Sequence, residues 1–256
     1  MKKITFSQII TLLATALTLT VNALANTLPI NGQMTGEISD RFDIFFVPAG
    51  YVFSIWGLIY LGLIAFALFQ TLPAQRENTL LKEIAPAYWL GSLANAAWIL
   101  LWHYEYFPLT LVAMLILLAT LLYIYMRISK ARTSLDRSQK WLVQLPFSIY
   151  LGWISVATIA NVSQVLFYAG WNAWGISAAA WTAIILGVAS FLGLVMLLRE
   201  YDFAYNLVLI WAFIGIAIKH VDTDLVAYSA WVFTVVLVLA VVIGLFRKRG
   251  LLPERG

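Results

Sequence analysis

Long apolar stretches separated by short polar segments dominate the sequence. Most stretches are close to the length of about 20 mostly apolar residues that an α-helix needs to cross the hydrocarbon core of a bilayer. The pattern predicts eight transmembrane helices, at residues 4–25, 49–70, 85–103, 108–128, 142–166, 174–198, 203–219 and 225–246. We therefore expect an all-α fold, that of a polytopic helical membrane protein.

The distribution of Lys and Arg supports this set of spans and gives it an orientation. If the N-terminus is cytoplasmic, all but two of the 16 basic residues fall in cytoplasmic segments, and the exceptions are Arg41 and Lys219. Lys and Arg are enriched on the cytoplasmic side of membrane proteins. Adding or deleting one internal span would scramble this partition. We therefore expect both termini in the cytoplasm and a bacterial inner membrane as the location.

The first apolar stretch has a second interpretation. Lys2 and Lys3, the apolar run and the segment Ala23-Leu24-Ala25 are also typical of a secretory signal peptide with its cleavage site. The charge distribution does not distinguish the two interpretations, because cleavage would leave the later spans in place. We expect retention of residues 1–25, for a reason given below.

The composition agrees with a lipid environment. The chain is 62% hydrophobic and 11% charged, whereas soluble domains are about 45–50% apolar and about 25% charged. There is no Cys, which excludes disulfides, thiolate metal sites and Cys nucleophiles. The basic residues occupy short loops and form no stripe, so nucleic acid is not an expected partner.

Three of the predicted spans carry aromatic and amide residues at matching helical offsets. Offsets of three, seven and eleven place such residues on one narrow face of an α-helix. No Lys, Arg, Asp or Glu lies within these runs, which are Phe53-x-x-Trp56-x-x-x-Tyr60, Asn95-x-x-Trp98-x-x-x-Trp102 and Tyr150-x-x-Trp153-x-x-x-Ala157-x-x-x-Asn161. Two explanations stay open at this point: hydrogen bonding between helices, and the lining of a ligand site. Trp102, near a span end, is expected to be an interfacial anchor.

The three runs, in this order, resemble the TspO/MBR family, the tryptophan-rich sensory proteins that include the mitochondrial translocator protein. The segment 48–53 and Trp56-x-x-x-Tyr60 resemble the second-span motif of the family, and Asn95-x-x-Trp98 resembles the third-span motif. Tyr150-x-x-Trp153-x-x-x-Ala157-x-x-x-Asn161 is similar to the fifth-span motif. The sequence departs from the family in keeping only one proline of a pair, Pro48, and in the position of Pro146.

This resemblance covers residues 4–166 and implies a division of the chain. Residues 1–166 would form a TspO-like core of five helices, and residues 167–256 would add three transmembrane helices and a short basic tail. Because the family core begins with a transmembrane helix, the resemblance favours retention of the first span. A homo-oligomer is compatible with this fold.

The resemblance also implies a pocket for a small, flat, hydrophobic ligand, chiefly a tetrapyrrole such as a porphyrin or haem, with the loop at residues 26–47 as its cap. No cofactor is required for such a binding function. In this interpretation Ala157 is small enough to leave room for the ligand. The ligand-binding residues carried over onto this sequence are Trp56, Asn95, Trp98, Tyr150, Trp153, Ala157 and Asn161.

A membrane binding or sensor protein is the first functional interpretation, and three alternatives stay open. One is a porphyrin-degrading enzyme with Trp56 and Trp153 as redox-active residues; the others are an ion-independent transporter and a membrane scaffold. The span interiors hold essentially no ionisable residue, which argues against ion-coupled transport.

No catalytic or metal site is predicted. The His–carboxylate neighbours are expected in short loops, and neither group supplies the three or four converging ligands of a metal site. The groups are His103 with Glu105, and His220 with Asp222 and Asp224. His103 is also a conceivable ligand to a porphyrin metal, although nothing else in the sequence supports that role.

Overall fold

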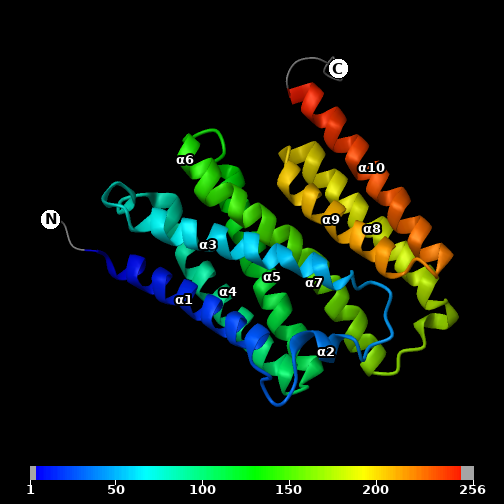
Figure 1. Ribbon diagram of the computed structural model, residues 1–256. Coiled ribbons are helices and arrows are strands. Elements are labelled where there is room, and N and C mark those ends of the chain that lie inside the picture. Colours follow the sequence, from blue (N-terminus) through cyan, green and yellow to red (C-terminus); the bar gives the residue numbers. More distant parts are fainter. Residues whose placement is uncertain (1–3, 249–256) are drawn as a thin grey trace. The chain divides into compact units, whose positions relative to one another are not determined.

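The apolar runs fold into long α-helices in the computed structural model, which describes residues 4–248 (Figure 1). Of these helices, seven are long and apolar enough to cross a membrane, and α9, with 17 residues, is a shorter apolar helix. In chain order the elements are α1 (Phe6–Thr27), α2 (Thr35–Ser39), η1 (Gly50–Ser54), α3 (Ile55–Thr71), η2 (Pro73–Gln75), α4 (Thr79–His103), α5 (Phe107–Lys130), α6 (Arg137–Gln139), η3 (Lys140–Gln144), α7 (Leu145–Tyr168), η4 (Ala173–Gly175), α8 (Ala178–Glu200), α9 (Phe203–Lys219) and α10 (Asp224–Lys248). The predicted all-α membrane fold is confirmed.

The start of α4 differs from the predicted start of the third span at residue 85. The helix begins at Thr79, because the side chain of Asn78 caps it by accepting a hydrogen bond of 3.2 Å from the backbone N–H of Leu81. Lys82 and Glu83 therefore lie in the first turns of α4. The hydropathy pattern assigns these two charged residues to a loop. They are helical because the cap formed by Asn78 starts the helix before them.

The described chain forms two compact units. The first comprises the chain up to Asp43 together with Ser54–Ala169, and the second comprises Ile44–Phe53 together with the chain from Gly170 onward. In the first unit α4 packs on α1 and α5, and α7 packs on α3 and α5. Close approach of α3 and α7 depends on Gly62, where a Cβ would lie 3.0 Å from the Cβ of Pro146.

The second unit pairs α8, α9 and α10 with one another. The segment 44–53 packs against α9, where the backbone N–H of Ala49 donates a hydrogen bond of 3.1 Å to the carbonyl of Gly215. The indole of Trp211 donates to the carbonyl of Val52 over 2.9 Å. A Cβ on Gly215 would lie 2.2 Å from the Cγ2 of Val52, so only glycine allows this contact.

Candidate functional site

An amide side chain on α4 connects three helices in the interior of the first unit. Oδ1 of Asn95 accepts a hydrogen bond of 2.6 Å from Nδ2 of Asn22 on α1, and its own Nδ2 donates to the hydroxyl of Tyr150 on α7 over 3.3 Å. All three side chains are buried. Because the chain here is apolar and lies at membrane depth, each of these polar groups needs a partner within the protein.

A second amide, Asn161 on α7, makes an equivalent connection farther along the helices. Its Oδ1 accepts a hydrogen bond of 3.1 Å from the indole Nε1 of Trp98 on α4, and its Nδ2 donates to Oγ1 of Thr110 on α5 over 2.9 Å. The exposed fraction of Asn161 is 1%. The amide thereby holds α4, α5 and α7 together.

The aromatic residues of α3 and α7 form a cluster beside these amides. The ring of Trp56 meets Tyr150 edge-on, with the centroids 6.1 Å apart, and meets Trp153 edge-on at 6.2 Å. It also stacks on Tyr60, with the centroids 5.5 Å apart. Edge-on and stacked arrangements at such distances are the favoured geometries of aromatic pairs.

Four of the seven predicted ligand-binding residues are joined by direct contacts. Trp56 contacts both Tyr150 and Trp153, and Asn95 bonds to Tyr150. Trp98 and Asn161 form a separate pair farther along the helices. Ala157 lies on α7 between Trp153 and Asn161 and is half-buried.

Phe53 lies just before the α-helix that carries Trp56, and its predicted place on one face with Trp56 stays a prediction. Residues 50–54 form the 3₁₀ turn η1, and α3 begins only at Ile55. The ring of Phe53 is 41% exposed.

A stripe of polar residues on α1 also faces the interior of the first unit, and the aromatic and amide motifs did not predict it. Its residues recur at alternating spacings of three and four, are all buried, and face the rest of the unit: Gln8, Thr11, Thr15, Thr18 and Asn22. This spacing was a readable signal, because polar residues at i, i+3 and i+7 in an otherwise apolar helix share one face. From Gln8 to Asn22 the stripe covers 15 residues, a rise of about 21 Å along the helix.

The partners of the stripe lie on α3 and α4. Nε2 of Gln8 donates to the carbonyl of Gln70 over 2.7 Å, and Nε2 of Gln70 donates back to the carbonyl of Gln8 over 3.1 Å. The hydroxyls of Thr15 and Tyr88 share a hydrogen bond of 2.7 Å. The stripe therefore bonds α1 to the unit near its start, its middle and, through Asn22, its end.

Residues 28–43, which we name the covering loop, pack against one end of α4. Ile38 of α2 is buried against Trp102 and Phe107, and Phe42 packs on the same cluster. The indole of Trp102 donates to the carbonyl of Thr35 over 3.2 Å. Trp102 is only 2% exposed, so its expected role as an interfacial anchor is wrong: the covering loop shields it from lipid and water.

The rim of the covering loop is polar. Glu105 accepts hydrogen bonds from Nη2 of Arg41 over 2.9 Å and from Nε2 of Gln33 over 3.0 Å. The hydrogen bond from Arg41, with a smaller contribution from Gln33, holds the pKa of the Glu105 carboxyl below its ordinary value. Both members of this ion pair are exposed, and exposed pairs stabilise a fold by at most about 1 kcal/mol.

His103 lies beneath the covering loop as the last residue of α4, and the expectation that it sits in a loop is wrong. Its side chain is fully buried. Nδ1 lies 2.8 Å from the carbonyl oxygen of Ile99, and Nε2 lies 3.2 Å from Oγ1 of Thr35. Both ring nitrogens are thus engaged with the protein, and a metal ligand would require the covering loop to move.

A small cavity adjoins the amide and aromatic groups at Tyr150. It is lined in part by Thr18, Tyr88 and Ser92 and has a volume of about 10 Å³. That is about the space of one water molecule. The cavity has an unused hydrogen-bonding group, since Oγ1 of Thr18 is buried without a partner. A flat ligand would need the surrounding helices to separate.

The comparisons with known proteins place this architecture in a family. A family model described as TSPO-like protein matches residues 8–243. The chain belongs to the TSPO-like protein family. The match extends well beyond residues 4–166, in which the motifs resemble TspO/MBR proteins, and includes α8 and α9 and most of α10. No curated protein and no solved structure matches the chain significantly.

Membership of the TSPO-like family confirms the relationship that the three motifs predicted. Together with the apolar helices, it identifies the protein as an integral membrane protein. The match begins at residue 8, inside α1, so the family pattern includes the helix that carries the polar stripe.

Proposed function

We propose that this protein binds flat hydrophobic ligands in its first unit, with tetrapyrroles such as porphyrin or haem as the first candidates. The observation that carries the proposal is the meeting of Trp56, Tyr150 and Trp153 with the amide of Asn95 inside one helical unit. Aromatic rings stack on a planar macrocycle, and a few polar groups in an apolar site orient its polar edge. The proposed ligand site consists of Trp56, Asn95, Trp98, Tyr150, Trp153, Ala157 and Asn161.

Ligand entry opens an interior that is closed in the present arrangement. The bond of Trp98 to Asn161 and the bond of Asn22 to Asn95 join helices across the site. Hydrogen bonds between membrane helices contribute only about 0.6–2 kcal/mol each. A ligand with polar groups on its edge replaces these bonds with its own, while its faces take over contacts with the aromatic rings.

The covering loop is the proposed entrance for the ligand. Its rim is held by the exposed Arg41–Glu105 ion pair, and its inner side by packing of Phe42 on Trp102 and Phe107. Displacement of residues 28–43 would uncover Trp102 and, next to it, the stacked ring of Trp98. The path leads from this end of α4 towards Asn161.

The proposed setting is a bacterial inner membrane, with both termini in the cytoplasm. The distribution of basic residues supports this orientation, because all but two lie in segments on the same side as the N-terminus. The covering loop, with Arg41, would then face away from the cytoplasm. A ligand-binding or sensor role in this setting requires no catalytic group.

The experiment is a titration of the full-length protein in detergent with protoporphyrin, followed by quenching of tryptophan fluorescence. We expect saturable binding that Trp153→Phe and Asn161→Ala weaken by roughly fivefold or more, which corresponds to about 1 kcal/mol. The matched control is Trp231→Phe, an exposed indole on α10 in the second unit. Unchanged binding in Trp153→Phe and Asn161→Ala would contradict the proposal. Repeating the titration under light and analysing the products separates binding from porphyrin degradation.

A further inference from the structure

A second, larger cavity lies at the other end of α4 from the covering loop. It has a volume of about 390 Å³ and forms where the start of α4 meets the end of α5 and the segment that leads to α7. This volume falls in the usual range of ligand pockets, about 300–1,000 Å³. The length of α4, roughly 37 Å at 1.5 Å per residue, separates this cavity from the covering loop.

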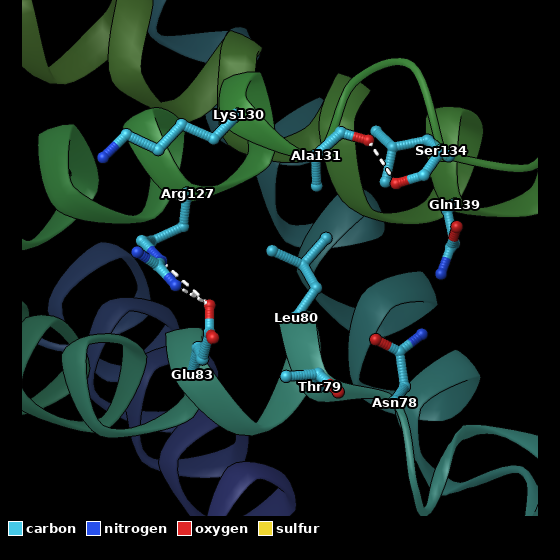
Figure 2. A pocket seen from close by; sticks show the side chains of 10 residues that line it. Asn78, Thr79, Leu80, Glu83, Arg127, Lys130, Ala131, Ser134 and Gln139 are labelled. Atoms are coloured by element: carbon cyan, nitrogen blue, oxygen red, sulfur yellow. Dashed lines mark hydrogen bonds and ion pairs between the residues drawn. The ribbon is translucent and has the colours of Figure 1, made fainter.

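One wall of the cavity is charged, as Figure 2 shows. Arg127 on α5 donates from Nε to Oε2 of Glu83 on α4 over 2.9 Å, and its Nη2 contacts the same oxygen. The charge of Glu83 is therefore balanced. Lys130, one turn farther along α5, lines the cavity as well and has no ion-pair partner among residues 4–247. The lining thus carries an excess of one positive charge.

The opposite wall supplies neutral hydrogen-bond donors. Oε1 of Gln139 accepts a hydrogen bond of 3.0 Å from the backbone N–H of Asp136, which leaves the NH₂ group of Gln139 unused. Thr79 and Leu80, the first residues of α4, also line the cavity. Their backbone N–H groups have no acceptor within the helix, and a helix N-terminus favours negative charge. In Figure 2 the side chain of Leu80 lies between the charged wall and the amides of Asn78 and Gln139.

The positive charge and the neutral donors of the lining favour an anion over other kinds of ligand. The carboxylate of Glu83 is engaged by Arg127, and the described part of the chain holds no group of three His, Cys, Asp or Glu that could bind a metal ion. Three of the ten lining residues have apolar side chains, namely Leu80, Ala131 and Leu135, and the other seven carry polar or charged groups. A lining with one excess positive charge and several neutral donors suits a group with several acceptor oxygens and a negative charge.

The position of the cavity along the membrane-spanning helices indicates which kind of anion it binds. α4 and α5 are both long enough to span the bilayer, so the start of one and the end of the other lie near the headgroup region. The adjacent segment is basic, with Arg132, Arg137 and Lys140 against a single acidic residue, Asp136. Basic pockets between membrane helices commonly bind anionic lipid headgroups.

We propose that this cavity binds a phosphate-bearing anionic headgroup. Lys130, the free N–H groups of Arg127, the NH₂ group of Gln139 and the start of α4 provide the donors. Leu80 and Leu135 lie next to the first carbons of an acyl chain. This site is independent of the proposed tetrapyrrole site, since none of its residues belongs to the aromatic and amide group.

The test is native mass spectrometry of the full-length protein in detergent, titrated with phosphatidylglycerol and, separately, with phosphatidylethanolamine. We expect phosphatidylglycerol to bind more tightly, and Lys130→Gln to weaken its binding roughly fivefold, the effect of about one charge near the membrane surface. Lys130→Arg should keep the affinity. The matched control is Arg132→Gln, which removes one positive charge from the adjacent segment without touching the lining.

A competition arm separates the two sources of the phosphate group. Displacement of phosphatidylglycerol by millimolar inorganic phosphate identifies the phosphate itself as the recognised group, and resistance to displacement identifies the lipid as the occupant. The proposal would be overturned if the two lipids bound equally, or if Lys130→Gln and Arg132→Gln weakened the binding of phosphatidylglycerol equally. Either result would show that lipid binding depends only on the general positive charge of this surface.

Discussion

The indole of Trp98 donates its hydrogen to the side-chain oxygen of Asn161, and this bond of 3.1 Å joins α4 to α7. The two residues come from two of the three motifs that resemble the TspO/MBR family. Asn161 also donates to Thr110, so one amide satisfies groups on two neighbouring helices. The same residues that are proposed to orient a ligand therefore hold the closed unit together.

This double role predicts the effect of Asn161→Ala on stability. The substitution leaves the indole N–H of the half-buried Trp98 and the hydroxyl of Thr110 without their bonds to Asn161. We expect the free energy of unfolding to fall by about 1–2 kcal/mol. The measurement is unfolding in mixed detergent micelles, followed by tryptophan fluorescence. Ser163→Ala is the matched control, because the hydroxyl of Ser163 bonds only to the carbonyl of Ile159 on its own helix. Equal losses in the two variants would contradict the prediction.

The covering loop gives a prediction about pH. Because the hydrogen bond from Arg41 lowers the pKa of Glu105 in the folded protein, the contact is complete above the ordinary Glu pKa of about 4.3. It is lost as the pH falls through the lowered pKa. We expect ¹³C NMR of the Glu105 carboxyl to show this lowered pKa, and Arg41→Gln to raise it towards the ordinary value. An unchanged pKa in Arg41→Gln would show that Arg41 is not its cause.

At neutral pH we predict that the ion pair of Arg41 and Glu105 limits the local opening of the covering loop but contributes little to the stability of the whole fold. We expect Glu105→Gln to increase amide hydrogen exchange in residues 28–43, while the free energy of unfolding changes by less than about 1 kcal/mol, since the pair is exposed. Exchange measured by mass spectrometry at one fixed pH compares the variant with the unaltered protein. Faster exchange throughout α4 and α7 would contradict a local role.

The polar stripe predicts that α1 stays in the protein. Removal of residues up to Ala25 would take Asn22 from Asn95, Thr15 from Tyr88 and Gln8 from Gln70. Unpaired polar groups at membrane depth cost several kcal/mol each. We therefore expect the intact mass of the protein purified from membranes to include α1. A mass that corresponds to cleavage after Ala25 would contradict this prediction.

The fold was predictable because membrane insertion imposes simple rules. Helix length and the Lys and Arg distribution located the eight apolar helices. The resemblance to the TspO/MBR family grouped Trp56 with Tyr150, and their rings are in contact. The partners within that interior were not predictable, since Asn22 and Asn95 are 73 residues apart and either could have faced another helix. The covering of Trp102 likewise depends on the tertiary position of residues 28–43.

Local backbone geometry limited the prediction in one further place. At α4, the cap supplied by Asn78 extended the helix over charged residues that the hydropathy pattern assigns to a loop. A single hydrogen bond from the backbone of Leu81 to the side chain of Asn78 marks this helix start, and apolar periodicity carries no information about it.

Glycine packing in the second unit gives a last prediction with a built-in control. A Cβ at Gly215 would lie 2.2 Å from Cγ2 of Val52 and 2.9 Å from Cβ of Pro48, whereas a Cβ at Gly57 would meet nothing within 4 Å. We expect Gly215→Ala to lower the free energy of unfolding by about 1–3 kcal/mol through overpacking. Gly57→Ala should be neutral or raise it by up to about 1 kcal/mol, because alanine is the better helix former. Thermal unfolding of both variants in one detergent measures the difference. Similar unfolding temperatures would show that the segment 44–53 is not held against α9 by this close contact.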